Sequence, residues 1–517
     1  MRTSSSIRNI LVSMGLGFFA IIVSFIAQRI FIENLTLEYL GINGLFVNII
    51  SMLAIAELGL GSAIVYHLYR PIADKDTEKI NSLMRFYKVG YRLIAAIVLV
   101  VGLCIMPFLP SIAGRHTVAL GLYPIFLLFL ADTIFSYLMS YKRSILYADQ
   151  KNYIINIVRI GSLIVLNLLQ IIILILTHNY FLYLIIKIVM TVIENLTLNY
   201  IIHKKYPVIQ YGSKAGPVDD ATKKDIYKKV RGLLYHKGGT FFVLGTDNVI
   251  ISIFLGIKTV GLYSNYLLIT MAINTMVSQI STAIVASIGN LLLEDDKPKH
   301  YKVYQNVYFA NFVVSSIATI IFFVVTDSFI RLWIGDKFVL PFGVLAALSF
   351  SLYLGLVRSP MNSFKTAAGI FHEDRYMPII ESVINLVFSI VLLHFFGLAG
   401  VFMGTALSAL FLHLYAYPKY TYGPLFARGR RGYYTEFAKY LLLATAVGIV
   451  TFVLSRLVTL ESNFLELLSD GAIALVVPIM LFYLVFRKTS EYAYFTNLGA
   501  NILQKTLKTY VRVKDRK

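Results

Sequence analysis

The sequence predicts an all-α integral membrane protein with about 14 transmembrane helices, since many of its apolar runs reach the ~20 residues that cross a bilayer. Of its 517 residues, 58% are hydrophobic and only 14% are charged, against roughly a quarter in soluble domains. A single soluble core cannot bury so many long apolar runs, which excludes a soluble globular fold.

The first predicted span is too long for a cleaved signal sequence and has no small-residue cleavage site, so we expect it to remain as a helix. The largest loop between spans, residues 203–232, contains glycine, proline and many charges, as a linker would. We place the spans at residues 10–32, 41–67, 88–109, 118–141, 153–177, 180–202, 233–256, 261–292, 304–326, 341–365, 377–396, 398–418, 436–458 and 470–486.

The 47 lysines and arginines are distributed as the positive-inside rule requires. With the N-terminus in the cytoplasm, most of them fall in loops on that side and in the C-terminal tail. The opposite loops contain only Arg115, Lys258, Arg331 and Lys337. Both termini are therefore predicted to be cytoplasmic, and topology accounts for the net charge of +20 without a nucleic-acid partner.

The two halves of the chain resemble each other at a nearly constant offset of 220 to 223 residues. The matched pairs are Gly41 with Gly261, Gly114 with Gly335, and Tyr153 with Tyr376. An even number of helices in each copy keeps both copies in the same orientation, so we predict two parallel six-helix repeats. The predicted domains are a first half (1–202), a cytoplasmic linker (203–232), a second half (233–418), two extra helices (419–486) and a basic cytoplasmic tail (487–517).

Two arginines inside predicted spans, Arg358 and Arg29, are candidates for binding a pyrophosphate. A charge near the bilayer centre costs roughly 2.5–3.5 kcal/mol on insertion scales, so it usually faces a partner or a wet cavity. Pro360 follows Arg358 and predicts a kink there, because proline removes a backbone hydrogen bond. Arg29 precedes Glu33 by four residues, so a local ion pair is the alternative to a phosphate contact.

Three acids, Asp247, Asp132 and Glu57, are candidates for cation coupling or gating. A carboxylate in an apolar site holds a proton more tightly than one in water does. The alternative for each is a structural pair between helices. Glu57 precedes Gly59 and Gly61, which thin the helix on two sides and allow close approach to a neighbour.

Other polar residues inside spans predict a wet helix face and one internal ion pair. Asn265, Asn274 and Gln279 recur along the eighth span at helical spacing, so we expect them to line a polar cavity wall. Lys187 and Glu194 are seven residues apart, on one face of the sixth span, and we expect them to neutralise each other.

The sequence contains no recognisable catalytic, metal-binding or cofactor-binding motif. It has no HExxH zinc motif, no GxSxG turn and no phosphate-binding loop, and Cys104 is its single cysteine. Duplicated halves with short loops and no outer domain suit a transporter that works by alternating access. We therefore expect a transporter and not an enzyme, with no cofactor.

Three stretches carry a family resemblance: YLGINGLF followed by AELGLGSAIVY, then LWIGDKF, then AAGIFHEDRYMPIIESVINLVFSIVL. Their order and spacing resemble those of the polysaccharide transporter family, the Wzx-type repeat-unit flippases. This family belongs to the superfamily of multidrug, oligosaccharidyl-lipid and polysaccharide exporters. The resemblance spans nearly the whole chain and implies a V-shaped exporter arrangement of the two repeats.

The resemblance also implies a function. Such proteins move undecaprenyl-pyrophosphate-linked oligosaccharides from the inner to the outer leaflet, for capsule, exopolysaccharide, O-antigen or teichoic-acid assembly. It implies a monomer in the bacterial cytoplasmic membrane, which works beside the glycosyltransferases and polymerase of its pathway. The alternatives are a lipid-II-type flippase, a multidrug exporter of the same superfamily, a membrane glycan polymerase and a scaffold without transport activity.

Overall fold

The computed structural model describes residues 2–53, 57, 60–207, 209, 216–458, 460 and 462–497, and in this part of the chain every regular element is helical. Twelve of the described helices are long and apolar enough to cross a membrane, which confirms a multi-pass all-α membrane protein. The second and seventh predicted spans correspond to shorter apolar helices, Leu37–Leu53 and Gly245–Leu255. The count of 14 and the side on which the termini lie stay predictions.

The chain divides into two compact units. Unit 1 comprises residues 1–268 and 375–404, and unit 2 comprises residues 269–374 and 405–517. The α-helices are α1 (Arg2–Asn34), α2 (Leu37–Leu53), α3 (Leu60–Ala73), α4 (Thr77–Ile105), α5 (Leu109–Ala113), α6 (Leu122–Ser140), α7 (Arg143–Ala148), α8 (Asn152–Thr177), α9 (Tyr180–Lys205), α10 (Asp220–Leu255), α11 (Ile257–Leu291), α12 (Lys297–Ile334), α13 (Phe342–Val357), α14 (Ser359–Ala368), α15 (Met377–Phe396), α16 (Leu398–Phe411), α17 (Gly423–Phe426), α18 (Arg430–Arg456) and α19 (Asn463–Phe486).

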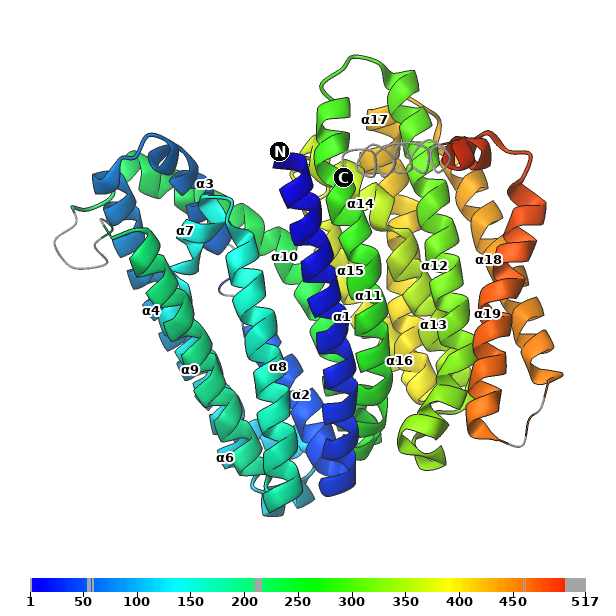
Figure 1. Ribbon diagram of the computed structural model, residues 1–517, viewed down its shortest axis with the longest axis horizontal. Helices are drawn as coiled ribbons and strands as arrows, with labels where there is room; N and C mark the ends of the chain where they lie inside the picture. Colours follow the sequence, from blue (N-terminus) through cyan, green and yellow to red (C-terminus); the bar gives the residue numbers. More distant parts are fainter. Residues whose placement is uncertain are drawn as a thin grey trace, which may run out of the picture. The chain divides into compact units, whose positions relative to one another are not determined.

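In unit 1, long helices pack in the order α4, α6, α9, α8 and α1, and Figure 1 shows α4, α9, α8 and α1 among them. The short helices α3 and α7 pack against each other at one end of this layer, and α3 also packs on α4. Their contact buries an apolar cluster that includes Ile64, Leu68, Leu83 and Ile145. This cluster fixes the helix ends that form the candidate site.

In unit 2, the 38-residue helix α12 is the centre of the packing. It contacts α13, α18 and α19, which surround it in Figure 1. Aromatic side chains fill these contacts, as in the stacked pair Phe312 and Tyr440, whose ring centroids are 4.3 Å apart. A π-helical turn, η5 (Leu412–Tyr422), continues α16 and packs on α14 and α18.

The packing of unit 1 reproduces the predicted repeat. Helix α1 packs on α8, and α10, its counterpart in the second copy, packs on α15, the counterpart of α8. Gly41 and Gly261, matched in the sequence, also make reciprocal contacts. A Cβ atom on Gly41 would lie 2.0 Å from the carbonyl oxygen of Ile257, and one on Gly261 would lie 2.5 Å from that of Leu37. Only glycine permits backbones to approach this closely.

Two predicted spans are divided in the structure. The tenth, residues 341–365, is α13 followed by α14 with the break at Arg358, which confirms the kink that Pro360 predicts. The second, residues 41–67, is α2 followed by α3, and Glu57 lies in the break between them.

The predicted linker, residues 203–232, is helical over its last part, because α10 begins at Asp220. The side chain of Asp219 accepts a hydrogen bond of 2.9 Å from the backbone nitrogen of Thr222 and caps this helix. The division into a first half, a second half and two extra helices stays a prediction. Residues 498–517 of the predicted tail lie outside the described residues.

Candidate functional site

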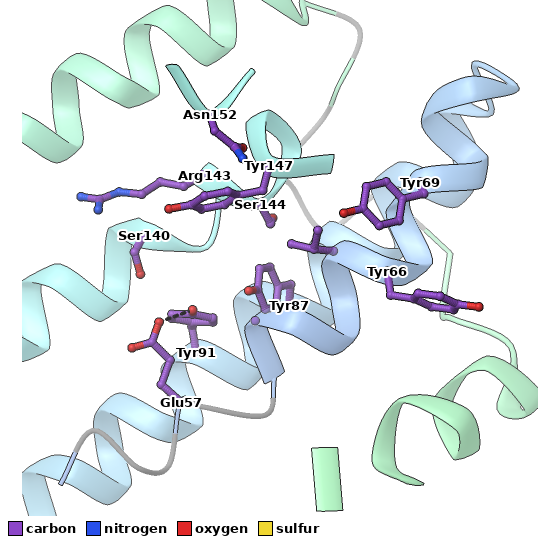
Figure 2. A pocket seen from close by; sticks show the side chains of 12 residues that line it. Glu57, Tyr66, Tyr69, Tyr87, Tyr91, Ser140, Arg143, Ser144, Tyr147 and Asn152 are labelled. Atoms are coloured by element: carbon purple, nitrogen blue, oxygen red, sulfur yellow. Dashed lines mark hydrogen bonds between the residues drawn. The ribbon is translucent and has the colours of Figure 1, made fainter. Parts of the chain in front are cut away.

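A cavity of about 620 Å³ lies at one end of unit 1, between α3, α4, α7 and the beginning of α8. Figure 2 shows that Tyr69, Tyr87 and Tyr147 converge on it from three of these helices. The tyrosines that line it are Tyr66, Tyr69, Tyr87, Tyr91 and Tyr147, and the other polar residues are Glu57, Ser140, Arg143, Ser144 and Asn152. The positive-inside pattern predicts that this end of the unit faces the cytoplasm.

Helical spacing places the tyrosines on the cavity. Tyr87 and Tyr91 are four residues apart on α4, and Tyr66 and Tyr69 are three apart on α3, so each pair shares one helix face. The rings of Tyr87 and Tyr91 meet edge to face with centroids 4.8 Å apart. Gly61 also lines the cavity, and a Cβ atom there would lie 3.2 Å from the hydroxyl of Tyr87. A side chain at this position would therefore fill part of the cavity.

Glu57 lies at the floor of the cavity. The hydroxyl of Tyr91 donates a hydrogen bond of 2.5 Å to its Oε1 atom, shown by the dashed line in Figure 2. A hydrogen bond to a charged group contributes roughly 1.5–3 kcal/mol. The acid in the sequence AELGLGSAIVY thus holds the end of the broken second span against α4. This contact supports the structural alternative for Glu57 and leaves cation coupling untested.

Arg143, the first residue of α7, is a cavity residue that the sequence analysis did not select. Its Nη2 atom donates hydrogen bonds of 2.9 Å to Glu194 and to Asn195 on α9, and its buried Nε atom has no hydrogen-bond partner. In Figure 2 its guanidinium extends away from the tyrosines. In the sequence, Arg143 only follows the end of an apolar span. A hydropathy argument reads such a residue as one of the positive charges of a cytoplasmic loop.

The predicted pair of Lys187 with Glu194 is wrong. Glu194 pairs with Arg143, and the Nζ atom of Lys187 lies 3.3 Å from Asp132 on α6. Asp132 also accepts a hydrogen bond of 2.6 Å from Thr191. Because α6 packs against α9, Asp132 lies closer to Lys187 than Glu194 of the same helix does. The role of Asp132 in coupling stays a prediction.

Neither arginine predicted to bind pyrophosphate lines this cavity. The Nε atom of Arg29 lies 2.8 Å from Glu33, and both side chains are about half exposed. The predicted local pair is therefore present. Arg358 lies in unit 2, at the break between α13 and α14.

Asp247 lies on α10, next to a polar stripe of α15. Glu381, Asn385 and Ser389 are buried at successive turns of α15, and α15 packs against α10. The hydroxyl of Thr246, beside Asp247, donates a hydrogen bond of 3.4 Å to Asn385. Among the described residues, no group of three or more acidic, histidine or cysteine side chains could hold a metal ion.

The residues predicted to form a polar wall are not among those that line the cavity. Asn265 is fully buried and accepts a hydrogen bond of 3.0 Å from Gln28, which ties α11 to α1. Asn274 donates to the backbone oxygen of Thr270 at 2.8 Å, and Gln279 is exposed. Asn274 and Gln279 belong to unit 2, and their role in transport stays a prediction.

One ionic group next to the cavity closes the turn between α7 and α8. Asp149 accepts hydrogen bonds from Lys151 and from Tyr206 on the loop after α9. Partial burial alone would raise the pKa of Asp149, but these two hydrogen bonds and the charge of Lys151 outweigh it and lower the pKa below its usual value. Burial, together with the neighbouring charge of Lys88, lowers the pKa of Lys142 at the same end of the unit.

No protein-family model matches the sequence, and no curated protein sequence matches it. Solved structures do match. The lipid II flippase MurJ in an inward closed conformation aligns with a TM-score of 0.67 at 14% identity, over 92% of this chain and 99% of MurJ.

Two multidrug transporters of the MATE family align less extensively. An inward-facing MATE transporter of the MOP superfamily gives a TM-score of 0.57 at 16% identity, over 76% of this chain and 92% of its own. A variant of VcmN from Vibrio cholerae gives 0.52 at 16% identity, over 81% and 97%. The chain therefore has the fold that MurJ shares with MATE transporters.

Proposed function

We propose that this protein is a flippase, which moves undecaprenyl-pyrophosphate-linked oligosaccharide repeat units from the inner to the outer leaflet. The cavity in unit 1 carries this proposal. Its volume of about 620 Å³ lies within the roughly 300–1,000 Å³ of small-molecule sites. A lipid-linked saccharide is the substrate class that suits the shared fold and the chemistry of this cavity.

The lining suits a sugar better than an apolar drug. Tyrosine presents an apolar ring face and a hydroxyl tip, so the exposed Tyr66, Tyr69 and Tyr147 can cover the C–H faces of sugar rings and bond to their hydroxyls. Tyr87 and Tyr91 are buried and form the inner wall. Ser140, Ser144 and Asn152 add further hydrogen-bonding groups. Arg143 bonds Glu194 and Asn195 through Nη2, and its Nε atom is the group that has no partner and could contact an anionic linkage.

In this proposal Arg358 and Arg29 contact the pyrophosphate at later stages of transport. The acids Asp247, Asp132 and Glu57 couple or gate the movement, with Asp247 beside the polar stripe of α15 as the best supported of the three. Asn274 and Gln279 contact the sugar. The two repeats rock against each other in the bacterial plasma membrane, with both termini in the cytoplasm, and one copy of the chain suffices.

Two other substrate classes are alternatives to a lipid-linked repeat unit. A lipid-II-type substrate has the same polyprenyl-pyrophosphate chemistry, and MurJ, whose fold this chain shares, is named as a lipid II flippase. A multidrug exporter for cations would require a mainly acidic cavity, whereas this one is lined by one carboxylate and one guanidinium.

Depletion of the protein from its own cells tests the proposal. With the glycosyltransferases intact, intact lipid-linked repeat units should accumulate on the cytoplasmic leaflet, where an impermeant glycan-modifying enzyme cannot reach them in whole cells. Repeat units that reach the outer leaflet but stay unpolymerised would contradict a flippase and favour a polymerase. Accumulation of lipid II alone would replace the proposed substrate by the lipid-II-type one.

A further inference from the structure

A group of basic and aromatic side chains lies at one end of unit 2, where η5 packs on the beginning of α18. Its cations are Lys419 of η5 and two exposed residues in the first turn of α18, Arg430 and Arg431. Together with Tyr415 and Tyr434, they form what we call the basic aromatic patch. The proposed transport cycle does not use these residues.

Lys419 is held beside two aromatic rings. Its Nζ atom donates a hydrogen bond of 2.7 Å to the hydroxyl of Tyr415 and lies 4.8 Å from the centroid of that ring. The ring centroid of Tyr420 lies 4.9 Å from the same atom. Cation–π attraction therefore helps to keep this charge at the surface of η5. The backbone here is π-helical, a form that is rare in proteins and is frequently found at functional sites.

The first turn of α18 brings both arginines to the same place. The hydroxyl of Tyr434 donates a hydrogen bond of 2.8 Å to the backbone oxygen of Leu414, the residue before Tyr415. Tyr434 is four residues after Arg430 and three after Arg431, so both arginines are its neighbours on the helix surface. Contacts within the chain thus gather the cations of α18 and of η5 around one pair of tyrosines.

The patch has no counter-charge in its own segment. No aspartate or glutamate occurs between Glu381 and Glu436, whereas this stretch contains one lysine and three arginines. The third arginine, Arg428, is engaged elsewhere, because its guanidinium carbon lies 3.9 Å from the ring centroid of Tyr301 on α12. An anion from outside the segment would give the other three cations a charged partner.

The patch lies where two candidate membrane spans end. These spans are Leu398–Phe426 and Arg430–Arg456, and the patch takes its residues from the end of the first and the beginning of the second. Leu414, Tyr415 and Tyr434 are 48%, 41% and 37% exposed, so apolar and aromatic surface adjoins the cations. Tyrosine is enriched at the level of the lipid headgroups. The anion present at this depth is the phosphate of a membrane lipid.

We propose that the basic aromatic patch binds the headgroup of an anionic phospholipid of the bilayer. The three cations contact the phosphate, and the exposed apolar side chains of η5 contact the first part of the acyl chains. A zwitterionic lipid fits less well, because its own cation already balances its phosphate. This site lies in unit 2, apart from the saccharide cavity of unit 1, and does not depend on the substrate of the transporter.

Native mass spectrometry of the purified full-length protein in detergent tests this site. The protein is titrated with phosphatidylglycerol and, separately, with phosphatidylcholine, and the dissociation constant of the first bound lipid is measured for each. The wild type should prefer phosphatidylglycerol. The triple variant Lys419→Gln, Arg430→Gln and Arg431→Gln should bind phosphatidylglycerol at least about tenfold more weakly, because each basic residue contributes roughly a fivefold factor near an anionic lipid surface. Its affinity for phosphatidylcholine should not change.

A second triple variant is the matched control. Lys297→Gln, Lys299→Gln and Lys302→Gln remove the same charge from the beginning of α12 in the same unit, and this variant should keep the preference for phosphatidylglycerol. Equal phosphatidylglycerol affinity in the wild type and the first triple variant, with equal thermal unfolding, would overturn the proposal. An equal loss in both triple variants would also overturn it, because net charge alone would then attract the lipid. So would full competition by inorganic phosphate at the concentration of the lipid, which would identify a site for free phosphate instead.

Discussion

The second and eighth predicted spans are matched in the sequence repeat, but their helices differ in the structure. In the first copy, α2 ends at Leu53 and α3 begins at Leu60. In the second copy, α11 runs without a break from Ile257 to Leu291. The offset of 220 residues aligns AELGLGSAIV with MVSQISTAIV, so Glu57, Gly59 and Gly61 of the first copy correspond to Val277, Gln279 and Ser281.

The two copies differ in sequence at the positions that line the cavity of unit 1. Glycine costs roughly 1 kcal/mol more than alanine within a helix, and two glycines with an acid between apolar residues favour a break. The break places Glu57 under Tyr91 and leaves Gly61 without a side chain at the cavity wall. The second copy has neither glycine, and its helix continues.

The close backbone contact at Gly41 and Gly261, which both copies share, should be the most sensitive to substitution. Gly41→Ala and Gly261→Ala each place a methyl group on a backbone oxygen, which we expect to destabilise the protein by about 3 kcal/mol or more. Because the contacts are reciprocal, the two variants should lose similar thermal stability in detergent. Gly161→Ala, with no atom within 4 Å of the added methyl, is the control and should keep or slightly raise stability, because alanine favours the helix. A large difference between Gly41→Ala and Gly261→Ala would break the symmetry argument.

The next largest effect should come from Arg143, which lines the cavity of unit 1. Arg143→Ala removes the cation and leaves Glu194 unpaired, so we expect at least about a tenfold lower flipping rate in proteoliposomes, together with lower stability. The double variant with Glu194→Gln should recover stability but not flipping. Arg70→Ala, whose side chain is 93% exposed, is the control and should retain activity. Full flipping by the double variant would remove Arg143 from the site.

Tyr91→Phe tests the structural role of Glu57 directly. It deletes the hydroxyl that donates to Oε1 of Glu57 and should reduce the free energy of unfolding by about 1.5–3 kcal/mol. Tyr66→Phe changes a cavity tyrosine that is 60% exposed, and it should leave stability unchanged. Equal thermal unfolding curves for the two variants would show that the contact between Glu57 and Tyr91 does not stabilise the break.

The smallest effect should come from Asp149, which closes the turn between α7 and α8 next to the cavity. Its pKa is lowered in the folded protein, so the unfolded chain binds more protons as the pH falls. The stability that Asp149 contributes is complete above the ordinary aspartate pKa of about 3.9 and is lost as the pH falls through its folded value. The stability difference between wild type and Asp149→Asn should therefore be constant above about pH 5 and shrink as the pH falls below about 4. A constant difference would contradict the role of Lys151 and Tyr206.

Hydropathy alone predicted the fold class, and Pro360 predicted the break at Arg358. The break after Leu53 was not predicted, because the apolar run continues through Glu57 and hydropathy does not measure helix continuity. The ion pairs of Lys187 and Glu194 were mispredicted, because the choice depends on which helices pack together. Arg143 was missed for the same reason, since only the fold places it on a cavity.

The most direct test of the central claim is flipping by the purified protein. Vesicles containing a lipid-linked oligosaccharide are probed with an impermeant glycan-modifying enzyme, with and without the protein. If the cavity of unit 1 carries the saccharide across, the protein should make the protected lumenal pool accessible, and Arg143→Ala combined with Glu194→Gln should leave it protected. Wild-type vesicles whose lumenal pool stays protected, under conditions in which the protein is folded, would contradict the flippase account.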